Sequence, residues 1–490
     1  MVFSLRQLQE KCREQRQPLF IAFIDLTKAF DLVSRDGLFK ILPKIGCPPR
    51  LLSIIRSFHD DMKGTVVFDG STSDAFIIRS GVKQGCVLAP TLFGIFFAVM
   101  LKHAFGPTTE GIYLRTRSDR KLFNLSRLRA KSKVQRKCVR DFLFADDAAV
   151  TAHSAEGLQQ QTVVFDGSTS DAFIISLQSC FFADDAAVTA HSAEGLQQLM
   201  IRFNEACDDF GLTISLKKTQ VMGQDVDQPP DIRIADHRLD VVHDFVYLGS
   251  TISDSLSLDA ELNRRIGKAA TTMSRLTKIV WSNNKLSEHT KIQVYRACIV
   301  STLLYGSESW TLRARQERKL NSLHMRCLRR ILNITWQDKI TNNTVLERAG
   351  MTSMFTLLKQ RRMRWLGHVV RMDDGRIPKD LLYGELTEGT RPTGRPKLRY
   401  KDVCKRDLKA LHINTDSWEA TASERSAWRQ AIQQGLHVFE ETLAQQSEAK
   451  RQRRKAQNPA DQPASIFTCD QCGRDCHSRI GLSSHTRRCT

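Results

Sequence analysis

The stretch Phe182-Ala183-Asp184-Asp185 repeats Phe144-Ala145-Asp146-Asp147 letter for letter, within identical segments that cover 144–160 and 182–198. Two adjacent carboxylates on a tight turn are typical of a site for divalent metal ions, because such ions prefer oxygen ligands. An isolated Asp-Asp pair is more often a solvated turn or a helix N-cap. We call each Asp-Asp pair a doublet. One metal site needs only one doublet, so the motif indicates metal-ion chemistry and its second copy indicates that the chain has been rearranged.

A second repeat defines the extent of the rearrangement. Residues 162–175 are identical to residues 65–78. Taken with the identity of 182–198 to 144–160, this indicates that residues 161–198 are an insertion between Gln160 and Leu199. The unit occurs once and combines two separate segments, which excludes a solenoid. Identity without drift indicates either a recent rearrangement or an error in the assembled gene.

Composition favours a nucleic-acid partner. The chain has 490 residues, a net charge of +20 and a pI near 9.6, which points to a polyanion. The longest apolar run, Leu92–Leu101, is too short to span a bilayer, and the N-terminus lacks a signal-peptide pattern. Nine of the 13 cysteines are scattered. We therefore expect no membrane partner and no secretion, and a nuclear and/or cytoplasmic location.

Local patterns predict the main elements. Predicted helices cover 4–16, 91–105, 192–210 (ending at Gly211) and most of 259–370. Predicted strands are Phe20–Leu26, a hairpin over 65–78 with an Asp69-Gly70 turn, extended segments within 112–140, and Leu212–Leu216. Residues 446–465 are basic, polar and contain proline, which predicts a linker.

A wider set of residues supports the metal chemistry. Asp25 ends an apolar strand, and a strand-end carboxylate with a turn-borne pair can hold two divalent ions about 4 Å apart. Lys218 follows a predicted strand and could protonate a leaving pyrophosphate, although a single lysine is usually a solvated surface residue. Ser80–Phe93 combines a glycine-rich turn, the amide of Gln84 and a helix start, which suits close approach by a base pair.

In this order, the motifs resemble the palm of reverse transcriptases from non-LTR (LINE-type) retrotransposons. They are Phe23–Asp31, Gly81–Phe93, the Phe-Ala-Asp-Asp turn, Gly211–Thr219 and Phe245–Ser250. Leu303–Glu308 and Arg364–His368 resemble the C-terminal half of the same proteins. The resemblance implies an RNA-directed DNA polymerase that uses two Mg²⁺ (or Mn²⁺) ions, an RNA template, a DNA primer and deoxynucleoside triphosphates.

The resemblance also implies roles for single residues. Asp25 and the first Asp of one doublet (Asp146 or Asp184) would bind metal, supported by the second (Asp147 or Asp185), with Lys218 as the acid. Phe30 would exclude a ribose 2′-OH, Gln84 and Gly85 would line the nucleotide pocket, and Tyr247 with Gly249 would grip the primer end. We favour the second doublet, because the helix after it runs uninterrupted to Phe210.

Family members carry an endonuclease domain and most of a fingers subdomain before the helix at 4–16, so we expect an N-terminally truncated polymerase. The alternative is a catalytically inactive retroelement remnant that only binds nucleic acid. Lys359–Trp365 predicts a helix with a cationic face, suited to the backbone of an RNA–DNA hybrid or simply solvated.

The C-terminus predicts a zinc site. Cys469, Cys472, His485 and Cys489 follow the spacing C-x₂-C-x₁₂-H-x₃-C, with one structural Zn²⁺. Cys476 takes the place of a core residue in this pattern. Ser478, Gly481 and Ser484 stand at the base-reading positions and are too small to select bases, so contacts with nucleic acid should be nonspecific.

The predicted fold is therefore α+β. A right-hand polymerase palm, an antiparallel sheet with packed helices, spans 1–255 and includes the duplicated insert. A mostly helical region follows at 256–440, then a basic linker at 441–466 and a small ββα zinc finger at 467–490.

Overall fold

The computed structural model describes most of the chain outside the repeated segment. The described residues are 1–82, 87–106, 108–117, 119, 121–124, 127–128, 130, 133–139, 141–143, 185–389, 391–392, 394, 397–456, 467–476, 478–487 and 489. Within them no helix has the length and apolarity needed to cross a bilayer.

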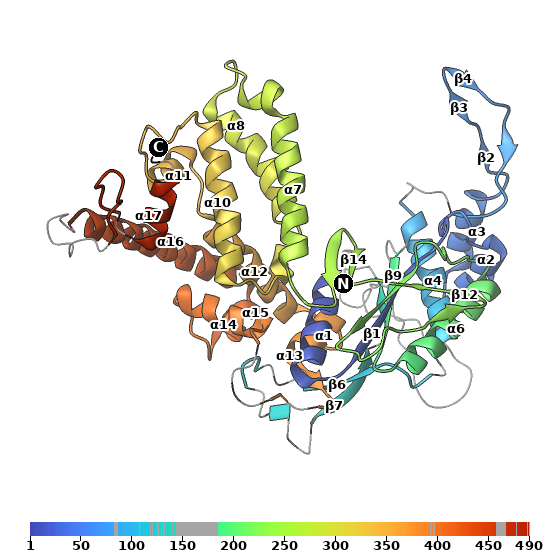
Figure 1. Ribbon diagram of the computed structural model, residues 1–490. Coiled ribbons are helices and arrows are strands. Elements are labelled where there is room, and N and C mark those ends of the chain that lie inside the picture. The colour runs from blue at the N-terminus through green and yellow to red at the C-terminus, as the bar shows by residue number, and fades with distance from the viewer. Residues whose placement is uncertain are drawn as a thin grey trace.

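A five-stranded sheet lies at the centre of the N-terminal half (Figure 1). Its strand order is β13 (Asp240–Val241), β10 (Gln220–Gln224), β1 (Leu19–Asp25), β9 (Asp185–Ala190) and β8 (Asp141–Leu143). All pairs are antiparallel except β10 with β13. The expected antiparallel palm sheet is therefore confirmed for its inner strands.

Strand β1 is buried on both faces because alternate side chains enter two different cores. Phe20, Ala22 and Ile24 pack with α4 (Ala89–Phe105) and α6 (Ala193–Phe210). Leu19, Ile21 and Phe23 pack with α1 (Val2–Gln15) and with the hairpin of β14 (Asp244–Tyr247) and β15 (Ser250–Ser253). The helices predicted at 4–16, 91–105 and 192–210 are confirmed, and α1 is mostly buried although many of its residues are polar.

The repeated segment enters the sheet through its second copy. Strand β8 precedes the first copy, while β9 is formed by residues of the second copy, and the two strands pair from Leu143↔Ala186 to Asp141↔Val188. Residues 144–184 lie between them, outside the described residues. The first doublet and Asp184 therefore lie outside the described residues.

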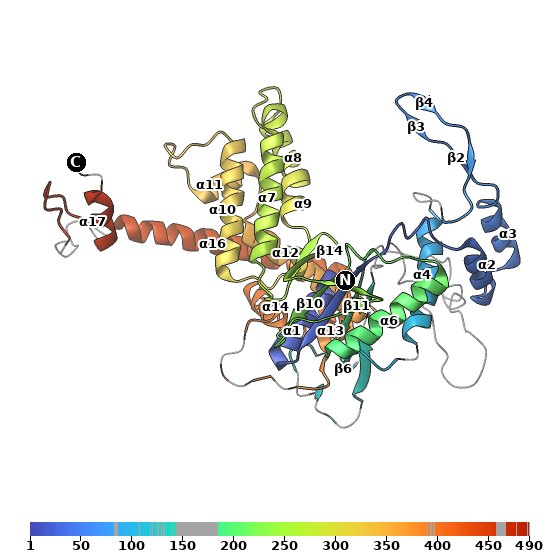
Figure 2. The same cartoon turned by 45° about the vertical axis from the view of Figure 1, so that its right-hand side comes forward.

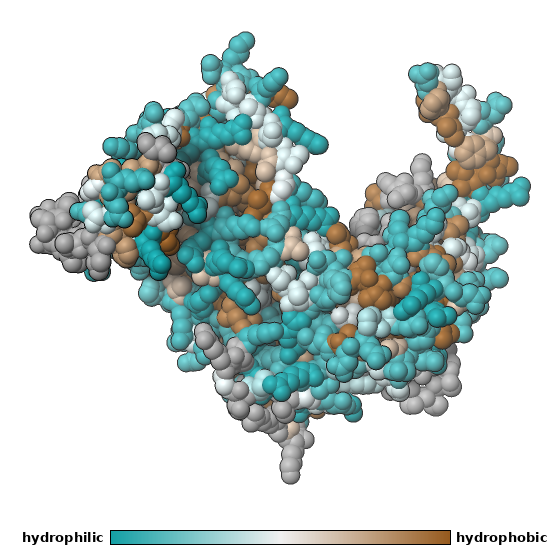
Figure 3. Space-filling view, viewed as in Figure 1, coloured by the Kyte–Doolittle hydropathy of each residue, from teal (hydrophilic) through white to brown (hydrophobic). Residues whose placement is uncertain are grey.

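The predicted hairpin at 65–78 is confirmed and has two parts. Strands β2 (Lys63–Gly64) and β5 (Phe76–Ile77) form its base, and β3 (Val67–Phe68) and β4 (Ser71–Thr72) form its tip. Asp69 and Gly70 have φ of 46° and 79° at the turn. The hairpin stands away from the sheet, beyond α2 (Arg35–Lys44) and α3 (Pro49–Ser57), with apolar side chains exposed (Figure 3).

The predicted strand Leu212–Leu216 is wrong. Only Ile214 makes an isolated bridge, to Leu26. The Ser215 amide donates to the Asp25 carbonyl, and the amides of Lys218 and Thr219 then turn back onto the Ser215 carbonyl. Because of this turn, the next strand, β10, begins only at Gln220, four residues after the predicted strand was expected to end.

The helices after the palm form an upright bundle beside the sheet (Figure 1). They pack through one apolar core, which confirms the predicted helical region. The main helices are α7 (Asp259–Arg275), α8 (Glu288–Val294), α9 (Ser301–Leu303), α10 (Ala314–Ile331) and α11 (Asn342–Ala349).

The C-terminal helices return to the N-terminus. They are α12 (Met354–Arg371), α13 (Ile377–Tyr383), α14 (Tyr400–Ala410), α15 (Trp418–Ser423) and α16 (Arg425–Ala456). Phe3 of α1 lies in their core, and β16 (Glu385–Leu386) adds an edge strand to β6 (Ile112–Thr116), which pairs with β7 (Gln135–Val139). The boundary proposed at 255 is therefore crossed by both a sheet and a core.

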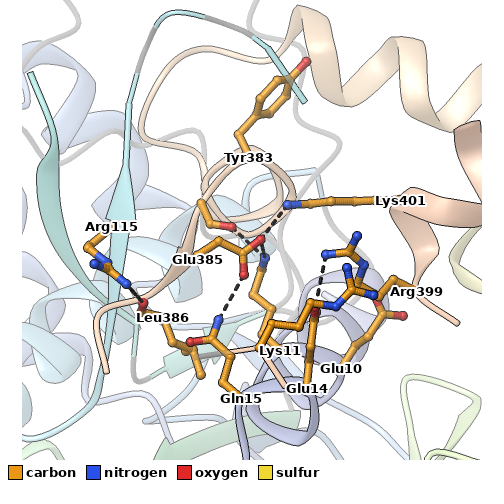
Figure 4. A network of polar contacts seen from close by, with 12 residues as sticks. Glu10, Lys11, Glu14, Gln15, Arg115, Tyr383, Glu385, Leu386, Arg399 and Lys401 are labelled. Carbon is orange, nitrogen blue, oxygen red and sulfur yellow. Dashed lines mark hydrogen bonds and ion pairs between the residues drawn. The ribbon is translucent and has the colours of Figure 1, made fainter. Parts of the chain in front are cut away.

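A polar network joins α1 to these helices (Figure 4). Glu385 accepts hydrogen bonds from Gln15 at 3.0 Å and Lys401 at 2.9 Å, and Lys11 lies 3.4 Å away. Burial opposes ionisation of Glu385, but Lys11 and Lys401 hold the pKa of its carboxyl well below the usual range. Its charge is therefore neutralised by cations inside the protein.

The linker predicted over 441–466 is wrong for its first part. Helix α16 continues without a break to Ala456 and projects from the body (Figure 2). Its sequence is rich in Ala, Gln, Glu, Lys and Arg, which are good helix formers, and no proline occurs before Pro459. Residues 457–466 lie outside the described residues.

Candidate active site

The candidate site begins at the end of β1. Asp25 pairs across the sheet with Asp185, the first residue of β9, so the two chain positions lie side by side. The Asp25 backbone amide donates to Thr219 Oγ1 at 3.3 Å, and its carboxylate is 20% exposed. The sheet therefore presents one carboxylate directly beside the position that follows Asp184.

Lys218 reaches the same carboxylate from the turn before β10. Its Nζ lies 3.0 Å from Asp25 Oδ2, while the lysine side chain is 71% exposed. The structure thus brings together the two predicted residues Asp25 and Lys218. Because the lysine is mostly solvated, its ammonium group can move away from Asp25 at little cost.

A pocket of about 300 Å³ opens at this point. Its lining comes from β1, β9, the Lys218 turn, β10 and β14, namely Phe23, Ile24, Asp25, Ala186, Lys218, Gln220, Phe245, Val246 and Tyr247. The pocket thus has a carboxylate and an ammonium group at one side and an apolar hairpin at the other.

The hairpin β14–β15 carries the predicted primer-gripping residues. Phe245 stacks on Phe23 with ring centroids 4.1 Å apart, which fixes the hairpin to β1. The side chain of Tyr247 is fully buried, whereas Val246 is 44% exposed. The part of this hairpin that is open to a ligand is therefore the Val246 side and the turn at Leu248-Gly249.

Phe30, the predicted ribose-excluding residue, is 8% exposed and stacks on Phe93 at 4.5 Å. It belongs to the core beside α4 and does not line the described pocket. Gln84, Gly85, Asp146, Asp147 and Asp184 lie outside the described residues, and only the backbone of Asp185 is described.

Arg35 was not singled out from the sequence. Its guanidinium donates to four carbonyl oxygens at 2.7–3.1 Å, those of His59, Ile78, Ser80 and Gly81. A Cβ on Gly81 would lie 2.7 Å from the Asp31 carbonyl oxygen, so only glycine fits there. Arg35 and Gly81 thus fix the segment that leads to Gln84. A lone arginine in an amphipathic helix gave no signal of this role.

The C-terminal cluster is assembled. Potential ligand atoms of Cys469, Cys472, His485 and Cys489 all lie within 4.8 Å of one another. Hydrogen bonds from the amides of Gln471 and Cys472 lower the pKa of the Cys469 thiol, which favours the thiolate that a metal needs. Three sulfurs and one imidazole nitrogen fit tetrahedral Zn²⁺.

The small fold around the cluster differs in part from the predicted ββα unit. Its helix is α17 (Arg479–Thr486), with Ser478 as N-cap. The two expected strands are reduced to one bridge, Thr468↔Asp475. Cys476 is 9% exposed and outside the ligand group, as expected for a core residue.

Several known proteins are similar to this chain in sequence. Residues 2–172 match the family described as reverse transcriptase (RNA-dependent DNA polymerase). A transposon-derived protein of Caenorhabditis elegans is 24% identical over 46% of this chain and 85% of its own length. The RNA-directed DNA polymerase from the mobile element jockey of Drosophila melanogaster is 23% identical over 64% of this chain but only 28% of its own length.

A telomerase from Candida tropicalis, solved with a fragment of telomeric RNA, covers 89% of this chain and 51% of its own chain at 10% identity, with a TM-score of 0.30.

Residues 2–172, which include Asp25 at the end of β1, are therefore similar to a reverse transcriptase domain. The relatives that the chain resembles include the RNA-directed DNA polymerases of jockey mobile elements and a Pol polyprotein of an R2 retrotransposable element.

Proposed function

We propose that this chain is the polymerase portion of a non-LTR retrotransposon reverse transcriptase, which copies RNA into DNA from deoxynucleoside triphosphates. The observation that carries the proposal is the pairing of Asp25 with Asp185 at the mouth of a pocket that also contains Lys218. The alternative is an inactive remnant that binds nucleic acid.

The donor set fits a hard divalent cation. Asp25 supplies carboxylate oxygens at the pocket, and Asp184 directly precedes β9, where it would supply the second carboxylate. Two Mg²⁺ (or Mn²⁺) ions, when bound, would lower the pKa of the primer hydroxyl and stabilise the leaving pyrophosphate.

The chain's own residues supply positioning and a proton. Asp25 would release Lys218 on binding a cation, since one carboxylate serves both. The freed Nζ would then protonate the pyrophosphate oxygen as it leaves. Tyr247-Leu248-Gly249 would hold the primer end through its turn.

The second doublet is the better candidate because β9, which continues from it, pairs with β1 in register through Ala190. Primer extension on an RNA template can separate the copies. We expect Asp25→Ala and Asp184→Ala to reduce the rate on the order of 100-fold or more, whereas Asp146→Ala and the exposed control Asp227→Ala should retain it. Equal activity of the wild type and Asp25→Ala would refute polymerase function.

The remnant hypothesis has its own support in the basic end of α16, where Lys450, Arg451, Arg453 and Arg454 are exposed. We propose that this end and one structural Zn²⁺ unit make nonspecific phosphate contacts in the nucleus and/or cytoplasm. Filter binding should weaken steeply with salt, since each neutralised phosphate releases counterions. A flat response between low and physiological salt would exclude this mode of binding.

A further inference from the structure

The segment Leu303–Glu308 is one of the motifs that resemble the reverse transcriptase family, but the sequence indicated no role for it. Its position beside the Leu248-Gly249 turn suggests a role. We propose that Tyr305, together with Arg265, is a positioning residue that clamps the Leu248-Gly249 turn and thereby aligns the primer end with Asp25. The inference rests on the proposed polymerase function and assigns two residues to it.

The clamp acts on both carbonyl groups of the turn. Tyr305 Oη donates to the Leu248 carbonyl oxygen at 3.0 Å, and Arg265 Nη2 donates to the Gly249 carbonyl oxygen. The two side chains also contact each other, because the Arg265 guanidinium carbon lies 4.6 Å from the centre of the Tyr305 ring. A Cβ on Gly249 would lie 3.7 Å from this ring, so the turn and the ring are in contact.

The turn needs such support. Leu248 and Gly249 have φ of 47° and 73°, which lies in the left-handed region, and a leucine is disfavoured there because its Cβ crowds the backbone. Two hydrogen bonds, one of them from a charged donor, can offset this cost. The clamp therefore selects one conformation for the residues next to the pocket.

Arg265 is itself held in place. It is 5% exposed and donates to Glu261 at 2.8 Å. Glu261 also accepts from the Thr251 amide at 2.7 Å and from Ser250 at 3.1 Å, and Arg6 of α1 donates to the same Ser250 hydroxyl at 3.0 Å. Burial opposes ionisation, but these donors hold the pKa of Glu261 below its usual range. The carboxylate stays charged and fixes the guanidinium.

The hairpin is thus attached at two ends. Phe245 stacks on Phe23, two residues before Asp25, and the turn is attached to α7 and to the 303–308 segment. A movement of the helical bundle would therefore move the turn relative to Asp25. This geometry explains why a segment remote in sequence serves the same pocket.

Tyr305→Phe tests the hydroxyl, since it keeps the ring over Arg265 and changes a side chain that is 49% exposed. Tyr383→Phe is the matched control, because its hydroxyl donates to Glu419 at 3.0 Å away from the pocket. We expect the single-turnover extension rate of bound primer–template to fall about fivefold in Tyr305→Phe only. The Kd of the duplex should change less than twofold in both.

Hydrogen exchange of the amides at 248–250 supplies a readout independent of catalysis. Exchange should accelerate in Tyr305→Phe and not in Tyr383→Phe. Unchanged exchange overturns the clamp, and faster exchange with an unchanged extension rate overturns the positioning role. A wild type that makes no product refutes the polymerase function and the positioning role with it, while the exchange data still decide whether the clamp exists.

Discussion

The ammonium nitrogen of Lys218 lies 3.0 Å from Oδ2 of Asp25, although the two residues are far apart in the sequence. Antiparallel pairing of β1 with β10 sets Phe23 opposite Gln220, so the turn before β10 falls beside the end of β1. The same pairing leaves the lysine largely exposed, free to serve either as a partner of the carboxylate or as a proton donor.

Lys218→Ala should lower the rate of nucleotide addition by roughly 100-fold, the typical contribution of a general acid. The matched control is Lys217→Ala, which removes a neighbouring charge that is also exposed and should leave the rate within about twofold. Primer extension at saturating primer–template measures both. Equal loss in the two variants would indicate an effect of net charge rather than proton donation.

Glu10 should make stability depend on pH. Burial raises the pKa of its carboxyl to about 7, against the hydrogen bonds from the Tyr400 amide and Thr311. The folded chain therefore holds a proton between about pH 4.5 and 7 that the unfolded chain has lost, so the free energy of unfolding falls as pH rises through this window.

Glu10→Gln keeps the hydrogen-bonding shape and removes the titration. The difference in free energy of unfolding between Glu10→Gln and the wild type should grow by on the order of 2 kcal/mol from pH 5 to pH 7. Urea titrations at the two pH values measure it. A difference that stays constant with pH would mean that Glu10 is ionised throughout.

Asp407→Ala should destabilise the C-terminal helices by about 3–5 kcal/mol. The carboxylate is fully buried, contacts Arg362, and lies 2.7 Å from Lys359, so its removal leaves two buried cations without a counter-ion. Asp416→Ala, at an exposed position, is the control. Urea unfolding followed by tryptophan fluorescence should report the loss, because Trp428 packs on the same helices. A small effect would show that water reaches the vacated site.

Cys472→Ser should abolish binding of one Zn²⁺ per chain, because only four ligand atoms converge at the cluster among the described residues. Cys476→Ala should retain the metal. Metal analysis after dialysis gives the stoichiometry. Retention of zinc by Cys472→Ser, or its loss in Cys476→Ala, would assign the ligands differently.

Much of this protein follows from local patterns. The helix at 192–210 was predicted from its apolar stripe and the Gly211 stop, and the structure confirms it with Ser192 as N-cap. The grouping of Cys469, Cys472, His485 and Cys489 was predicted from cysteine and histidine spacing alone, and the structure brings these four residues together. These features depend on neighbours in sequence, where periodicity and spacing are direct physical signals.

Other predictions failed where distant contacts decide the outcome. The strand predicted at 212–216 is replaced by a bridge and a turn, because the Ser215 amide donates to the Asp25 carbonyl at the end of β1 and the amides of Lys218 and Thr219 donate back to the Ser215 carbonyl. The first part of the predicted linker, 441–456, is a helix. The burial of α1 was not predicted at all: its polar residues Lys11 and Gln15 are buried because they contact Glu385, more than 350 residues away in the sequence. Burial of polar groups depends on partners that the local pattern does not contain.

The sequence by itself therefore indicated the class of domain, the candidate carboxylates and the Cys/His group that could bind zinc, because these depend on residue type and spacing. The tertiary structure decided which strand stands beside Asp25, that Lys218 reaches it, and that Tyr305 and Arg265 hold the turn at the pocket. The physical reason is that sheet register and side-chain contacts are set by packing of the whole chain, which brings together residues that no local pattern relates.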